Sequence, residues 1–132
     1  MGTLLQSAVQ YIEGRVEHGK KLGRMIGFPT ANLSVATHYL PHNGVYGVYV
    51  YINDRQYAGV MNIGNRPTFN DGTHVTVEVH ILNFQDMIYG EQMIVEPVFQ
   101  IRPEEKFKCI EALIKQLKKD VQYAQYIFSS FK

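Results

Sequence analysis

Apolar and polar residues alternate through the middle of the chain, and this two-residue period is typical of β-strands with one buried face. The most regular segment is residues 75–82, where Val or Ile occupies every second position as far as Ile81. Residues 45–52 alternate in the same way and are followed by the turn-forming pair Asn53-Asp54. The pattern therefore predicts a β-hairpin in which residues 57–63 form the returning strand.

Three shorter segments also predict strands, at residues 11–18, 31–35 and 93–101. Pro97 lies within the third of them, and because proline cannot donate a hydrogen bond to a neighbouring strand, it indicates an edge position or a bulge. Residues 19–29 contain several glycines and end in Pro29, so we expect a loop there. Residues 65–72 are rich in turn-forming residues and are expected to form a second loop.

The last quarter of the chain changes to the period of an α-helix. Between Phe107 and Val121, apolar residues recur at alternating steps of three and four, and Cys109 lies beside them as an expected packing residue. Pro103 suits the first position of a helix, and the two glutamates after it suit the positive end of the helix dipole. We expect a helix over residues 103–126, with a packing face of Phe107, Ile110, Leu113, Ile114, Leu117, Val121 and Ala124. Strands followed by one helix predict a mainly β fold, a small antiparallel barrel or sandwich with the helix packed on it.

Composition and charge limit the classes of function. The chain has 132 residues, of which 45% are hydrophobic and 19% charged, and this indicates a single folded domain over residues 1–132. The net charge is +1, so no basic excess favours a nucleic acid or an anionic membrane as a partner. The single cysteine cannot form an internal disulfide, and no apolar segment is long enough to span a membrane. We therefore expect a cytoplasmic protein.

Glu78 is the first candidate for chemistry, because it stands in the middle of the most regular predicted strand. It shares the face opposite the apolar residues with Thr76 and His80. A carboxylate on a rigid strand can act as a general base, and nearby apolar surface would raise its pKa toward neutrality. The alternative is an ordinary glutamate that faces solvent, and the pattern alone favours that alternative.

Thr30 and Asn32 form a second candidate site. They are two residues apart and follow Pro29, so in an extended segment their side chains point the same way. A hydroxyl and an amide oxygen suit Mg²⁺, which takes its other ligands from water and phosphates. A turn in which both side chains bond their own backbone explains the same residues equally well.

The glycine-rich loop before Pro29 contains Lys20, Lys21 and Arg24. Residues 14–20 fit the spacing GxxxxGK, but Lys21 stands where a phosphate-binding P-loop needs Ser or Thr, and the glycines that follow exclude the required helix. The exposed backbone N–H groups and the three cations could still wrap a polyphosphate. A flexible, solvated surface loop is the alternative.

Taken in order along the chain, these segments resemble the riboflavin kinase family. Residues 14–32, with their spaced glycines and final Pro-Thr-Ala-Asn, are similar to the glycine-rich flap and the PTAN motif of that family. Residues 44–47 (Gly-Val-Tyr-Gly) and 62–69 are similar to its next two motifs. Residues 77–81 with Tyr89-Gly90, and then residues 102–107, are similar to the segment of the catalytic glutamate and to the start of the C-terminal helix. The resemblance extends over about residues 10–126.

The resemblance implies a six-stranded antiparallel β-barrel with a C-terminal helix packed on it. It also implies transfer of the γ-phosphate of ATP to the ribityl 5′-hydroxyl of riboflavin, which gives FMN. Glu78 would be the catalytic base that takes the proton from this hydroxyl, while Thr30 and Asn32 would bind ATP and hold its Mg²⁺. The remaining ATP-binding residues would be Gly19, Lys20, Lys21, Arg24, Ile81, Asn83 and Tyr89. The flavin would be bordered by Arg102, Glu105 and Ala112.

Two further expectations concern partners and alternatives. In many bacterial members of the family an FAD synthetase (nucleotidyltransferase) module precedes the kinase domain, and this chain begins too close to the kinase motifs to contain one. We therefore expect either a kinase with a single activity or the kinase half of a larger protein. An inactive flavin-binding or regulatory barrel is the alternative function. A nucleic-acid-binding barrel with tyrosine platforms is a third, which the charge balance disfavours.

Overall fold

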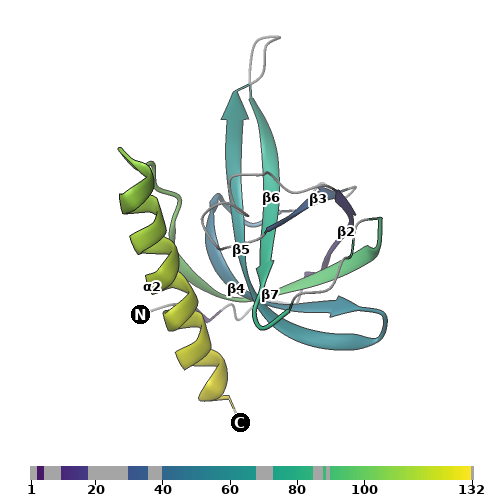
Figure 1. Ribbon diagram of the computed structural model, residues 1–132. Helices are drawn as coiled ribbons and strands as arrows, with labels where there is room; N and C mark the ends of the chain where they lie inside the picture. The colour runs from purple at the N-terminus through teal and green to yellow at the C-terminus, as the bar shows by residue number, and fades with distance from the viewer. Residues whose placement is uncertain are drawn as a thin grey trace.

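The computed structural model describes residues 3–4, 10–17, 30–35, 40–67, 73–84, 88 and 90–131. Strands come first along the chain and are followed by a helix, as the sequence predicts (Figure 1). The strands are β1 (Thr3–Leu4), β2 (Ile12–Glu17), β3 (Ala31–Val35), β4 (Gly44–Ile52), β5 (Arg55–Pro67), β6 (Thr73–Ile81) and β7 (Gln92–Pro103). The helix is α2 (Ile110–Ser129).

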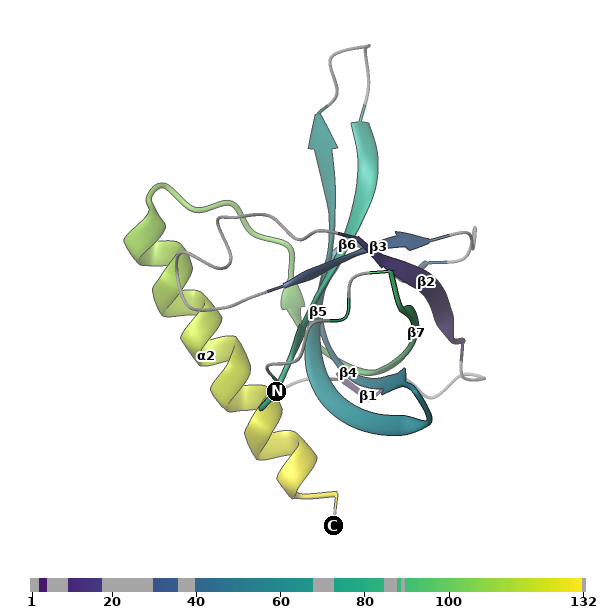
Figure 2. The same cartoon turned by 45° about the vertical axis from the view of Figure 1, so that its right-hand side comes forward.

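The strands form a closed barrel. The order β7-β2-β3-β6-β5-β4 returns to its beginning because β4 also pairs with β7, and these pairings are antiparallel. β1 stands outside the ring and extends the sheet at β7. Closure pairs strand edges that would otherwise be open to other chains. The predicted six-stranded antiparallel barrel with a C-terminal helix is confirmed, and Figures 1 and 2 show the helix beside the barrel from two directions.

Two local predictions about the strands are confirmed. Asn53 and Asp54 have φ angles of 51° and 65°, so both central residues of the β4–β5 turn have the left-handed conformation of a type I′ hairpin. In β7, Phe99 pairs with Gly47 whereas Pro97 pairs with the next residue of β4, which leaves Val98 as an extra residue. The predicted irregularity at Pro97 is therefore a β-bulge.

The interior of the barrel is filled by the inward-facing residues of its strands. In β6 the predicted alternation holds for Val77, Val79 and Ile81, which are buried. Val75 differs, because its side chain is 48% exposed. It pairs with Asn65 in the part of β5 and β6 that projects beyond the other strands (Figure 1). The expected loop over residues 65–72 is wrong at its start, since β5 continues to Pro67, and residues 68–72 lie outside the described residues.

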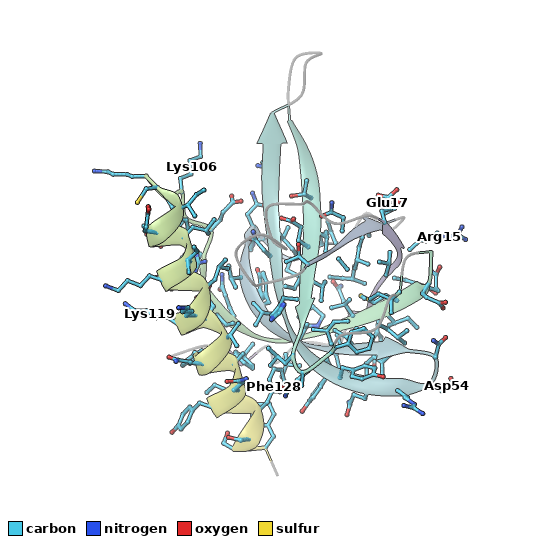
Figure 3. The ribbon with its side chains drawn as sticks, viewed as in Figure 1. Arg15, Glu17, Asp54, Lys106, Lys119 and Phe128 are labelled. Carbon is cyan, nitrogen blue, oxygen red and sulfur yellow. The ribbon has the colours of Figure 1, made fainter. Side chains whose placement is uncertain are left out.

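A second apolar cluster joins the outer face of the barrel to α2. Its buried members are Val45, Val60, Leu82, Phe99 and Ala124. The Phe99 ring lies 5.2 Å from the ring of Phe128, measured between centroids, and Figure 3 shows Phe128 between the helix and the barrel. The same Phe99 ring covers Gly47 so closely that a Cβ at that position would collide with it.

The predicted start of the helix is wrong. Pro103 is the last residue of β7 and pairs with Gly44, so it cannot also begin a helix. The helix begins at Ile110, and Cys109 in front of it has the extended φ and ψ of an N-cap residue. Cys109 is exposed rather than packed. At the other end, α2 continues to Ser129, beyond the predicted end at residue 126.

The packing face of α2 agrees with the predicted apolar face at Val121 and Ala124 but differs from it elsewhere. Its buried residues are Asp120 and Ala124, and the partly buried residues packed on the second cluster lie in its C-terminal half. Ile110 is 50% exposed. Figures 1 and 2 show the N-terminal end of α2 farther from the barrel, and the helix residues that pack on the second cluster begin at Val121. Within the described residues, no helix is long and apolar enough to cross a membrane.

Candidate active site

The candidate residues meet in one row across the outside of the barrel. Asn32 of β3 pairs with Glu78 of β6, which in turn pairs with Asn62 of β5. On the other side, Asn32 pairs with Glu17 of β2, which is labelled on the outside of the barrel in Figure 3. Directly paired residues lie about 4.5–5.5 Å apart between Cα atoms and present their side chains on the same face. We call these four residues the Glu78 row.

The row faces outward because the neighbouring residues in each strand face inward. Ala31 and Leu33 flank Asn32 and are buried in the barrel, as are Val77 and Val79 on either side of Glu78. Asn32 and Glu78 are half-buried, and both residues take part in interactions within the protein. Thr30 is also half-buried and immediately precedes β3. The structure thus brings the predicted base and the predicted oxygen ligands together on adjacent strands.

This arrangement has a definite chemical capacity. A carboxylate held on a strand of a closed barrel can accept a proton from a group bound against the outer face. The amide oxygen of Asn32 beside it, with the hydroxyl of Thr30, is suited to a hard cation. In the part of the chain that the structure describes, no group of three or more His, Cys, Asp or Glu residues could hold a metal ion.

The other predicted nucleotide-binding residues divide into two sets. Ile81 is buried in the interior of the barrel, so its side chain and that of Glu78 are on opposite faces of β6. Asn83 is exposed in the turn after β6, with a φ of 56°. Gly19, Lys20, Lys21, Arg24 and Tyr89 lie outside the described residues.

Arg102 continues the same row on the far side of Asn62. Asn62 pairs with Val45 of β4, and Val45 pairs with Arg102 of β7. The guanidinium group of Arg102 is directed to the helix, where Nη2 donates to Oδ2 of Asp120 at 2.8 Å and Nε donates to Oδ1 at 3.0 Å. Of the other two residues expected at the flavin, Glu105 is exposed before α2 and Ala112 is half-buried in the first turn of the helix.

The motif at residues 44–47 has a structural explanation. A Cβ on Gly44 would lie 2.9 Å from Nε2 of Gln100 and 3.1 Å from the carbonyl oxygen of Arg102. Tyr46 is buried, its hydroxyl donates to the carbonyl oxygen of His42 at 2.6 Å, and burial raises its pKa. These residues therefore allow β4 to pair closely with β7 next to Arg102.

Glu104 is a residue that the sequence interpretation placed only at a helix terminus. Its carboxylate occupies the space that a Cβ of Gly64 would fill, on β5 two residues beyond Asn62. Gly64 pairs with Thr76, whose hydroxyl donates to the carbonyl oxygen of Gly64 at 3.3 Å. A second carboxylate thus lies on the same face as Glu78, and the glycine within an alternating strand was the available signal for such a close approach.

The fold and the row define a class of protein, a closed antiparallel barrel with a carboxylate and oxygen ligands on its outer face. The family model described as riboflavin kinase matches residues 7–128. The chain therefore belongs to the riboflavin kinase family.

Curated relatives agree with this assignment. The chain is 46% identical over 110 residues to an RNA-binding riboflavin kinase of Bacillus subtilis, an alignment that covers 83% of this chain and 47% of the relative. It is 45% identical over 120 residues to a bifunctional riboflavin kinase/FMN adenylyltransferase of Haemophilus influenzae, covering 90% of this chain and 39% of the relative. The chain thus spans less than half the length of these curated relatives.

Solved structures show the same fold. A Streptococcus pneumoniae structure titled as a macrolide-efflux protein matches with a TM-score of 0.82 and 39% identity, over 89% of this chain and 39% of that one. A riboflavin kinase from Trypanosoma brucei matches with a TM-score of 0.64 at 24% identity, over 95% of this chain and 83% of that one. The second likeness supports the barrel and its helix as a fold.

Proposed function

We propose that the chain is an ATP-dependent riboflavin kinase, which transfers the γ-phosphate of ATP to the ribityl 5′-hydroxyl of riboflavin and releases FMN and ADP. The observation that carries this proposal is the pairing of Glu78 with Asn32 on the outer face of the barrel, in a chain that belongs to this family. A preceding FMN adenylyltransferase part, as in the bifunctional relatives, would then use the FMN. A cytoplasmic location stays a prediction from the sequence.

In this mechanism Glu78 accepts the proton of the 5′-hydroxyl as its oxygen bonds to the γ-phosphorus, and the bond from that phosphorus to the β–γ bridging oxygen breaks to release ADP. Phosphoryl transfer depends mainly on positioning and on neutralisation of phosphate charge. The closed barrel contributes the positioning, because Glu78 and Asn32 are on hydrogen-bonded strands.

The donor set on this face fits a magnesium ion. Asn32 and Thr30 offer neutral oxygen ligands, and Mg²⁺ takes its remaining ligands from phosphates and water. Thr30 and Asn32 would therefore hold the ion against the ATP phosphates. When bound, Mg²⁺ neutralises phosphate charge, and Lys20, Lys21 and Arg24 would add to this from the loop before β3.

The proposal predicts that the purified chain converts riboflavin and ATP to FMN and ADP in the presence of Mg²⁺. Chromatography resolves FMN from riboflavin and gives the stoichiometry with ADP. An inactive flavin-binding barrel would bind riboflavin or FMN and form no ADP. No observation on the structure favours that alternative, so absence of FMN formation by the folded protein would overturn the proposal.

Two tyrosines of the β4–β5 hairpin, Tyr49 and Tyr57, argue against a nucleic-acid-binding barrel that uses them as platforms. Tyr49 lies against Phe128 of the helix, and Tyr57 packs edge-to-face on Phe84, with 4.9 Å between ring centroids in both pairs. Rings that are engaged in packing are not open platforms for base stacking. The net charge of +1 argues in the same direction.

Thr30→Ala is expected to weaken the use of Mg·ATP and to leave the fold unchanged. A ligand or hydrogen bond to a charged group contributes about 1.5–3 kcal/mol, so the KM for Mg·ATP should rise about 10- to 100-fold. Initial rates at varied ATP and Mg²⁺ measure the change. Ser34→Ala is the matched control, because Ser34 carries an exposed hydroxyl on β3, the strand that follows Thr30. An unchanged metal and ATP requirement in Thr30→Ala would remove Thr30 from the cation site.

A further inference from the structure

We propose that Arg102 and Asp120 form a clamp that holds the segment after β7 beside the face of Glu78 and fixes the orientation of the first half of α2. Arg102 is then a positioning residue for the acceptor substrate. This inference rests on the proposed kinase activity. It adds a pair of residues that do not contact the reacting atoms but position the segment after β7 and the helix. It also replaces direct flavin contact as the main role of Arg102.

The clamp is a buried, multiply bonded ion pair. The Asp120 side chain is 1% exposed and that of Arg102 is 15% exposed. Arg102 donates to both carboxylate oxygens of Asp120, and Nε2 of Gln116 donates to Oδ1 of Asp120 at 3.0 Å. A bidentate, charge-assisted pair of this kind stabilises the contact and also restricts the relative orientation of the two side chains. Loss of one partner would leave the other charge buried and unpaired.

One end of the clamp, Arg102, is connected to the Glu78 row by strand pairings. Arg102 pairs with Val45, Val45 with Asn62, and Asn62 with Glu78. The position of the Arg102 backbone relative to Glu78 is therefore set by three consecutive strand pairings of a closed barrel. Asp120, which is bonded to the Arg102 side chain, is therefore held at a fixed position relative to the barrel.

The other end of the clamp is Asp120, near the middle of α2, and the half of the helix before it has few other anchors among the described residues. The buried residues of the helix are Asp120 and Ala124, and Ile110 at its start is half exposed. Within the described residues, Cys109 makes no side-chain hydrogen bond that caps the first turn. The clamp at Asp120 is thus the contact nearest the N-terminal half that combines burial with directed bonds.

Arg102 also holds the segment between β7 and α2. Its guanidinium carbon lies 5.6 Å from the centroid of the Phe107 ring, which is a cation–π distance, and Nη1 donates to the carbonyl oxygen of Pro103 at 3.2 Å. Between these two contacts, Glu104 lies against Gly64 on the face that contains Glu78. The clamp therefore determines where this segment lies against the outer face of the barrel that carries Glu78.

The proposal predicts an effect on riboflavin and not on ATP. Asp120→Asn keeps the size of the side chain and removes its charge. We expect the KM for riboflavin to rise, or kcat to fall at saturating ATP, by a combined factor of about 10–100, because a small misplacement of an acceptor costs up to that much. The KM for ATP should stay close to wild type. Riboflavin binding, followed by its own fluorescence, should weaken by a similar factor.

The experiment compares Asp120→Asn, Arg102→Lys and the exchange Arg102→Asp with Asp120→Arg. Asp54→Asn is the control, since Asp54 is exposed at the β4–β5 turn. Hydrogen exchange of the amides of residues 110–117 should quicken in the two single variants and recover toward wild type in the exchange. Wild-type riboflavin kinetics with unchanged exchange in folded Asp120→Asn would overturn the proposal, as would an equal loss for ATP and riboflavin.

Failure of the clamp and failure of the kinase proposal are distinguishable. If the wild type forms no FMN, the kinase proposal fails, and a clamp that positions an acceptor substrate fails with it, even where hydrogen exchange shows that the ion pair orders α2. If the wild type is active and Asp120→Asn does not fold, Gln116→Ala takes its place, because it removes one of the bonds to Asp120 and leaves the ion pair. A smaller shift of the same riboflavin-selective kind is expected there, and no shift would count against the clamp.

Discussion

Glu78→Gln is expected to fold like the wild type and to form FMN about 10²–10⁴ times more slowly, which is the usual contribution of a general base. The amide keeps the shape of the side chain and its place opposite Asn32 and Asn62, but it cannot accept the hydroxyl proton. The loss should appear in kcat, because the proton moves only in the transition state. Initial rates of FMN formation at saturating riboflavin and Mg·ATP measure it, and thermal unfolding checks the fold.

Glu13→Gln is the matched control for Glu78→Gln. Like Glu78, Glu13 is an outward-facing carboxylate on a barrel strand, but it is exposed and pairs with Ile94 on the β2–β7 side, away from the Glu78 row. Its rate should stay close to wild type. Wild-type turnover in Glu78→Gln would exclude Glu78 as the base, and an equal loss in both variants would indicate a general electrostatic effect of the outer face.

The strands could be predicted from the sequence where one face is buried throughout. Val77 and Val79 alternate with polar residues because one side of β6 forms the barrel interior. The prediction failed at Val75, where β6 extends beyond the barrel and the apolar residue is exposed. Local alternation indicates that a segment favours a β-strand. Whether its apolar residues are buried depends on whether other strands of the barrel extend as far as they do.

The start of the helix could not be predicted, because a long-range pairing decides it. Pro103 followed by two glutamates is a good helix start, but Pro103 pairs with Gly44 and Arg102 pairs with Val45. The segment up to Cys109 is needed to cross from the barrel to the helix. Asp120 was missed for a related reason, since an aspartate in an amphipathic helix is normally solvated and nothing local indicates a buried arginine partner.

The site itself depended on two kinds of information. The alternation in β6 placed Glu78 on the outer face, and the spacing of Thr30 and Asn32 predicted a shared direction. The contact between Asn32 and Glu78 arises from the register of β3 on β6, which no local pattern contains. The resemblance to the family implied roles for Glu78, Thr30 and Asn32 in one reaction, and the register of the barrel places Asn32 beside Glu78.

Phe99→Ala is expected to be the most destabilising single change on the barrel. Phe99 is fully buried between β4 and α2, and its ring lies 5.2 Å from that of Phe128 and 6.1 Å from that of Tyr123. Removal of a buried phenylalanine costs about 3–5 kcal/mol, a large part of the stability of a small domain. The midpoint of urea unfolding measures the loss. Tyr126→Ala, at a helix position that is 69% exposed, should change stability by no more than about 0.5 kcal/mol.

The close approach of Phe99 to Gly47 makes this prediction testable in a second way. In the wild type, Gly47→Ala places a Cβ against the Phe99 ring and should cost about 1–3 kcal/mol by overpacking. In the Phe99→Ala background the ring is absent, so the same Cβ has room and fills part of the cavity. The two changes should therefore be less destabilising together than the sum of their separate effects. Additive free energies in this double-mutant cycle would mean that the Phe99 ring does not determine the need for glycine at position 47.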